Sequence, residues 1–192
     1  ICFVFPSRRA AIFFRKYLGQ GSSEPVLSPD LLTISDLYAN LSDLKVSDRI
    51  ELIYLMFTCF QQLDTNGSLT FDDFVQWGDI LLNDFSDIDK YMVDAGALLA
   101  NVKDLNALSG IDYLTVPQRE AIKHFWNVTI NAKRGEMRES FLSFWDLLLP
   151  LYNNFKALLQ SQGKAYDGMI YRNVAEKIVA DDGRFEALEK YR

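Results

Sequence analysis

With 192 residues, 49% of them hydrophobic and 14% aromatic, the chain can bury a core, which excludes intrinsic disorder. The net charge of −6 excludes nucleic-acid binding by overall charge, and the lack of an uncharged stretch of about 18 apolar residues excludes a membrane span. Two cysteines and one histidine exclude a disulfide framework and a multi-histidine metal site, and they favour a reducing, cytoplasmic setting.

The first predicted elements are a strand, a tight turn and a helix. The apolar run Cys2–Phe5 before Pro6 predicts a buried strand of a parallel sheet. Ser7 occupies the expected N-cap position, and apolar residues at helical spacing continue to Gly19, so Phe13 and Phe14 are expected in the core. Because the chain starts on a strand without a methionine or signal peptide, we expect it to be part of a larger protein.

A second strand and two helices are predicted next. Residues 31–34 form a short apolar run, and Thr33 and Ser35 are expected to cap a short helix over residues 37–41. Asp48, with Glu51 three residues later, is a capping signature for a helix that is apolar almost all round. That helix is expected at the centre of the core.

The rest of the chain predicts five more helices. Three of them follow the caps Thr70, Asp94 and Thr115, and two cover residues 136–162 and 165–179. Pro150 is expected to kink or split the helix over 136–162, and Gly163 to end it. The predicted fold is therefore predominantly α with a small parallel β edge.

Charge is distributed unevenly along the chain. Residues 1–20 contain four cations and no acid, whereas residues 64–94 contain eight aspartates and one cation, Lys90. Any contact with a phosphate backbone is therefore expected at the basic N-terminal segment. The alternative is that both regions are solvated helix faces.

Residues 64–72 resemble a calcium-binding loop between two helices. Oxygen-bearing side chains occupy the expected positions, but Leu69 stands where the turn needs glycine and Val75 where a bidentate glutamate closes the shell. We therefore favour an Asn-Gly turn followed by the Thr70 cap.

Pro29-Asp30 and Asp43-Leu44-Lys45 fit the short pattern of a metal-dependent PD-(D/E)XK nuclease. In such a site the second acid and the lysine lie on a strand, whereas Asp43 and Lys45 are expected in a polar connector, which favours a surface loop. No Walker A loop is present, since Gly163-Lys164 is followed by Ala165. The sequence predicts no cofactor and no metal site.

Several short motifs together resemble a known family. The segment Phe5–Phe14 resembles motif Ia of superfamily I helicases in the AddB/RecB-type form, and Leu32–Tyr38 resembles the motif Ib that follows. The resemblance continues in Phe71–Phe74, Trp77–Asp79, Asp84–Phe85, Asp87–Lys90, Gln118–Ile122 and Gln162–Met169. In this order they resemble the N-terminal, helicase-like region of Bacteroides-type PD-(D/E)XK nuclease family proteins, described as inactivated superfamily I helicases.

The resemblance implies a partial helicase subdomain 1A over residues 1–45 and a helical 1B-like insert over 46–192. It implies a bacterial protein of double-strand-break processing and recombinational repair, a nuclease (a hydrolase) whose catalytic motif lies outside these residues. The implied partners are DNA, the remaining domains and an AddA-like helicase-nuclease subunit. Because no Walker A loop is present, ATP hydrolysis is not expected here.

The candidate DNA-binding residues are Ser7, Arg8, Arg9, Thr33 and Ser35. Ser7 and Thr33 stand at helix starts, where free backbone amides bind anions, and the two arginines add charge-assisted donors for phosphate. The expected function is a non-catalytic fragment that binds or guides DNA. Two alternatives stay open: a protein-interaction module that docks a basic partner on the acidic 64–94 region, and a metal-dependent enzyme that uses Asp30 and Asp43.

Overall fold

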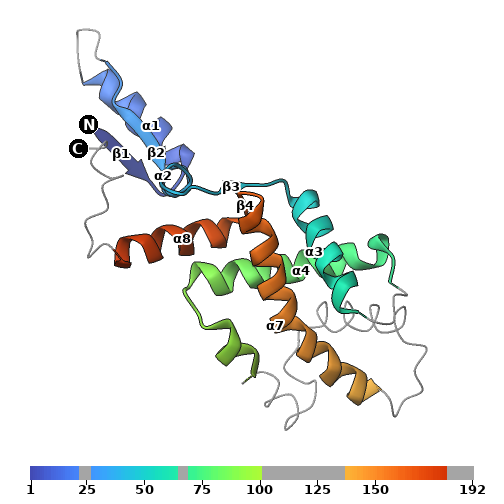
Figure 1. Ribbon diagram of the computed structural model, residues 1–192. Coiled ribbons are helices and arrows are strands. Elements are labelled where there is room, and N and C mark those ends of the chain that lie inside the picture. The colour runs from blue at the N-terminus through green and yellow to red at the C-terminus, as the bar shows by residue number, and fades with distance from the viewer. Residues whose placement is uncertain (22–26, 65–68, 101–136, 181–192) are drawn as a thin grey trace.

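The computed structural model describes residues 1–21, 27–64, 69–100 and 137–180, with side chains of the last range from residue 145 onward. These residues form a mostly helical protein with two small parallel sheets (Figure 1). The predicted combination of helices with a small parallel β edge is confirmed. None of the described helices is both long and apolar enough to cross a membrane.

The N-terminal unit alternates strands and helices: β1 (Cys2–Phe5), α1 (Arg8–Gln20), β2 (Asp30–Thr33) and α2 (Ile34–Leu41). Strands β1 and β2 pair in parallel, with Cys2 opposite Asp30 and Phe5 opposite Thr33. A parallel pair needs a crossover connection, and α1 lies in that connection. The predicted order of strand, turn and helix is confirmed.

The predicted burial of this unit is wrong in two places. Phe3 and Val4 of β1 are 39% and 43% exposed, and Phe13 of α1 is 52% exposed. Of the two phenylalanines, Phe14 packs on the sheet, with its ring 4.9 Å from that of Phe3 and 5.2 Å from that of Phe5. The face of α1 that is turned away from the sheet is exposed, and α1 has no fully buried residue.

Among the described residues, the helical part contains four long helices and a short helical stretch at residues 95–100. The long helices are α3 (Arg49–Leu63), α4 (Phe71–Lys90), α7 (Met137–Ser161) and α8 (Asp167–Ala180). Figure 1 shows α8 alongside α4, and α7 running across α4 from the start of α8; the shared core lies among these helices. The core is rich in aromatic side chains, including Phe57, Phe74, Trp77, Phe85, Phe155 and Tyr166.

The predicted caps of this part are confirmed where the structure describes them. Asp48 accepts from the amide of Ile50 at 2.9 Å, and Asp94 accepts from that of Ala97 at 2.9 Å. Thr70 forms a capping box with Asp73 at the start of α4. The predicted cap at Thr115 lies outside the described residues.

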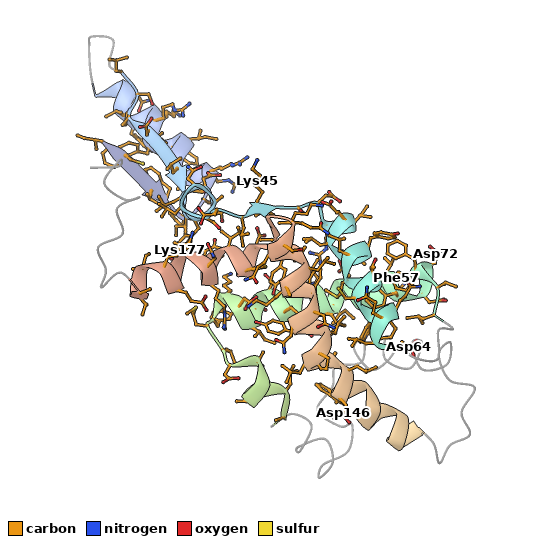
Figure 2. The ribbon with its side chains drawn as sticks, viewed as in Figure 1. Lys45, Phe57, Asp64, Asp72, Asp146 and Lys177 are labelled. Carbon is orange, nitrogen blue, oxygen red and sulfur yellow. The ribbon has the colours of Figure 1, made fainter. Side chains whose placement is uncertain are left out.

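A second two-stranded sheet, which the sequence did not predict, joins the two parts of the chain. Strands β3 (Lys45–Val46) and β4 (Lys164–Ala165) pair in parallel, and Figure 2 shows Lys45 at this junction. Lys45 therefore lies in a strand rather than a connector, and α8 begins after Ala165 rather than at it. Gly163, with φ of +66°, makes the turn before β4 as expected of a helix-ending glycine.

Two helices differ in part from the expectation. Of the predicted kink or split at Pro150, the split is absent, because α7 continues through Pro150 as one element. Helix α3 is central but not buried all round, because Ile50 and Tyr54 are 70% and 56% exposed.

Candidate nucleic-acid interface

Ser7 caps α1 as the sequence predicts. Its Oγ accepts a hydrogen bond from the amide of Ala10 at 3.3 Å, and the first turn of the helix carries no acidic residue. The amides of Arg8 and Arg9 belong to the first turn, so they have no acceptor within the helix. An anion at this end of α1 would meet these amides and two guanidinium groups.

Arg8 is partly engaged by an acid. Its guanidinium lies 3.6 Å from the carboxylate of Asp36, and its side chain is 85% exposed. Hydrogen bonds from the side chain and backbone of Thr33 lower the pKa of Asp36, and Arg8 lowers it further. An exposed pair of this kind contributes little stability, so a phosphate can compete for Arg8.

The four cations of α1 share one exposed face. Residues seven apart lie on one stripe of a helix, so Arg8 aligns with Arg15 and Arg9 aligns with Lys16 on the next stripe. All four are exposed. Ile12, 66% exposed, is three or four residues from each of them and therefore lies between the two stripes.

Exposed aromatic rings border this face. Phe13 is 52% exposed and Tyr17, one turn further along α1, is 67% exposed. We call Arg8, Arg9, Ile12, Phe13, Arg15, Lys16 and Tyr17 the cationic face of α1. Sequence reasoning placed Phe13 in the core and did not single out Tyr17. The available signal was the spacing, because both residues lie beside the cationic stripes.

Thr33 and Ser35 have structural roles in this arrangement. The Thr33 hydroxyl donates to Asp36 at 2.6 Å and accepts from the Asp36 amide at 3.1 Å, which completes a capping box at the start of α2. The Ser35 hydroxyl hydrogen-bonds with that of Tyr171 on α8 at 3.0 Å. Ser35 is therefore not the helix cap that the sequence predicted, and both hydroxyls are engaged within the protein. Of the five predicted residues, Ser7, Arg8 and Arg9 gather at one helix end.

The acidic residues of α4 differ in their surroundings. Asp79 accepts from Arg49 at 2.5 Å, which lowers the pKa of Asp79. Asp72, Asp84 and Asp87 are exposed. Desolvation raises the pKa of Asp84, and repulsion from Asp87 raises it further.

A pocket of about 330 Å³ opens beside Asp84 and Asp87. Its wall is mostly apolar and includes Val93 and Leu99, and the Tyr91 and Trp145 rings line it as well. It therefore combines an apolar floor with two carboxylates.

Asp89, in contrast, is fully buried. One carboxylate oxygen accepts from the hydroxyl of Tyr152 at 2.5 Å and from Lys156 Nζ at 2.9 Å, while the other accepts from the hydroxyl of Tyr166. Arg172 Nε forms an ion pair with it at 2.9 Å. Burial, followed by the proximity of Asp89, raises the pKa of both tyrosines, so both stay protonated as donors. This cluster ties α4 to α7 and α8, and sequence reasoning missed it because Asp89 sits within an acidic run.

The candidate metal patterns find no support in the described residues. Asp43 forms an ion pair with Lys177, and it does not form a metal site with Asp30. Lys164 donates a hydrogen bond to Glu51 at 2.7 Å. Among residues 1–21, 27–64, 69–100 and 137–180, no group of three potential ligands is placed to hold a metal ion. Residues 65–68 of the calcium-like segment lie outside the residues that the structure describes.

No family model, curated protein or solved structure matches this chain. The fold and the site therefore define its class by themselves. It is a mostly helical protein with a small parallel β unit, and it carries a cationic, aromatic-bordered helix face and a separate acidic pocket.

Proposed function

We propose that the N-terminal unit binds single-stranded DNA on the cationic face of α1. The observation that carries this proposal is the gathering of four exposed cations on one helix face beside the exposed rings of Phe13 and Tyr17. Cations neutralise phosphates, and exposed aromatic rings stack on unpaired bases. A duplex hides its bases from such rings, so the combination favours a single strand over a double strand.

In this proposal the chain is the helicase-like region of a DNA-repair nuclease, without catalytic activity of its own. The assignment of residues 1–45 to a partial 1A subdomain and of 46–192 to a 1B-like insert rests on the order of the motifs. The strand, capped turn and helix from Cys2 to Gln20 is consistent with motif Ia. DNA would then be guided past this region, and the remaining domains and an AddA-like subunit would be the partners.

The test is fluorescence anisotropy with a labelled oligothymidine at low salt. We expect binding by the chain, a loss of at least tenfold in affinity with Arg8→Ala/Arg9→Ala, and a steep fall of affinity with added salt. The matched control is Lys45→Ala/Lys90→Ala, which removes the same charge outside α1 and is expected to bind as the original chain does. Equal losses in the two double variants, or no binding at low salt, would contradict the proposal.

A second function is favoured by a different observation, the pocket beside the exposed acids of α4. Here the acidic region would dock a basic partner protein. Salt-dependent binding of decalysine, measured by calorimetry and weakened by substitution of Asp84 and Asp87, is the expected result. Absence of binding at low salt would leave DNA binding as the sole proposal.

A further inference from the structure

We propose that the pocket at the end of α4 accepts one lysine or arginine side chain of a basic partner protein. The proposal rests on the second function above, docking at the acidic region, and is independent of DNA binding. It assigns one site and one kind of side chain to that docking. The pocket volume of about 330 Å³ is ample for one long side chain.

Within the described part of the chain, the two acids at the pocket rim have no cationic partner. Asp84 and Asp87 are three residues apart on α4, so they lie on the same side of the helix. No lysine or arginine of the described residues forms an ion pair with either of them. Lys90, the nearest cation in sequence, forms no ion pair with either acid; its ammonium lies 5.9 Å from the ring centroids of Tyr171 and of Tyr91, which itself lines the pocket.

The wall of the pocket fits an amphipathic guest better than a simple ion. Among the described residues the lining is mostly apolar, and it includes two aromatic rings and two carboxylates. A Ca²⁺ ion takes six to eight oxygen ligands, which two side chains do not supply. A lysine or arginine buries its methylene stem on apolar surface and keeps its charged end near acids or over aromatic faces.

The raised pKa of Asp84 supports the same occupant. Its carboxylate is partly desolvated and is repelled by Asp87. A guest cation would offset both effects, since it places an opposite charge beside the carboxylate. Such unfavourable charge placement is frequent at binding sites.

The experiment uses the full chain and three short peptides, acetyl-Leu-Arg-Leu-amide, acetyl-Leu-Lys-Leu-amide and acetyl-Leu-citrulline-Leu-amide. Citrulline has nearly the shape of arginine without its charge. Binding is followed by NMR through the indole N–H signal of Trp145, which is assigned by its loss in Trp145→Phe. We expect the two cationic peptides to shift this signal and to bind at least tenfold more tightly than the citrulline peptide.

The variants separate the pocket from the general acidity of α4. Asp84→Asn/Asp87→Asn is expected to weaken the cationic peptides at least tenfold. The control Asp72→Asn removes an exposed acid near the start of the helix (Figure 2), about 18 Å along α4 from Asp84, and is expected to change little. Circular dichroism and thermal unfolding confirm that each variant is folded.

Three results would overturn the proposal: equal binding of the citrulline peptide, equal weakening by Asp72→Asn, or no shift of the Trp145 signal by either cationic peptide. Decalysine distinguishes these failures from failure of docking itself. If decalysine binds while the pocket tests fail, the acidic region docks basic partners without this pocket. If decalysine also fails to bind, both proposals fall.

Discussion

Gly168 on α8 lies directly against the main chain of Ser86 on α4. Its amide donates to the Ser86 hydroxyl at 3.0 Å, and a Cβ atom built on Gly168 would lie 1.9 Å from the Ser86 carbonyl oxygen. The two helices therefore touch at a point where no side chain fits. One turn further along α8, Arg172 reaches Asp89 of α4, so this close approach also positions the buried ion pair.

Gly168→Ala is expected to destabilise the protein strongly. The added methyl group overlaps backbone atoms, which cannot move aside as a flexible side chain can, so α4 and α8 must separate. Overpacking costs typically about 1–3 kcal/mol and occasionally more, and we expect the upper part of this range. Urea unfolding followed by circular dichroism measures the change.

Gly19→Ala is the matched control for that substitution. Gly19 is also helical, but a Cβ atom there meets nothing within 4 Å. Alanine in a helix is favoured over glycine by about 0.5–1 kcal/mol, so this variant is expected to be as stable as the original chain or slightly more so. Equal destabilisation by the two variants would contradict the close packing at Ser86.

Asp89→Ala is expected to cost about 3–5 kcal/mol of unfolding free energy. It leaves the cations of Lys156 and Arg172 next to each other in a largely buried place without their shared anion. Tyr166→Phe, which removes one donor to the same carboxylate, is expected to cost only about 1–3 kcal/mol. Denaturant unfolding of both variants checks the order, and a larger loss for Tyr166→Phe would contradict the central place of the charge.

Asp84→Asn is expected to stabilise the protein at neutral pH. The pKa of Asp84 is higher in the folded state than in the unfolded state, so the ionised carboxylate lowers the stability of the fold above the folded-state pKa. Below the unfolded-state pKa, Asp84 is protonated in both the folded and the unfolded protein, and it no longer affects stability. The advantage of the variant should therefore shrink as the pH falls through the folded pKa and then through the ordinary aspartate pKa of 3.8.

Thermal unfolding of Asp84→Asn and the original chain at a series of pH values tests this prediction. Asp79→Asn is the opposite control, because Arg49 lowers the pKa of Asp79. Ionised Asp79 stabilises the fold above its unfolded pKa, and this contribution is lost as the pH falls through the lowered folded pKa. Asp79→Asn is therefore expected to be less stable than the original chain at neutral pH.

Local signals in the sequence predicted the local structure well. The caps Ser7, Asp48 and Thr70 and the turn at Gly163 depend on neighbouring residues alone, and each is found as expected. Strand β1 and its parallel partner were also predicted, because an apolar run, a cap and a helix follow one another.

Features that depend on distant residues could not be predicted. The two-residue strands β3 and β4 have no periodicity to detect, and they form because Lys45 and Lys164 are brought side by side. Asp89 and Tyr166 are 77 residues apart, and nothing local distinguishes this aspartate from its exposed neighbours.

The aromatic and cationic residues of α1 are expected to affect DNA binding in different ways. Arg9→Ala or Lys16→Ala should lower the slope of log affinity against log salt by about 0.7, as expected for one phosphate contact on a single strand. Phe13→Ala or Tyr17→Ala should leave that slope unchanged and cost about 1–3 kcal/mol of binding free energy for each base that stacks. Anisotropy titrations of oligothymidine at several salt concentrations separate these effects.

A duplex of the same length should be insensitive to Phe13→Ala, because its bases are already stacked. If both aromatic variants bind oligothymidine normally while the cation variants do not, the face binds phosphate alone and the preference for a single strand is lost.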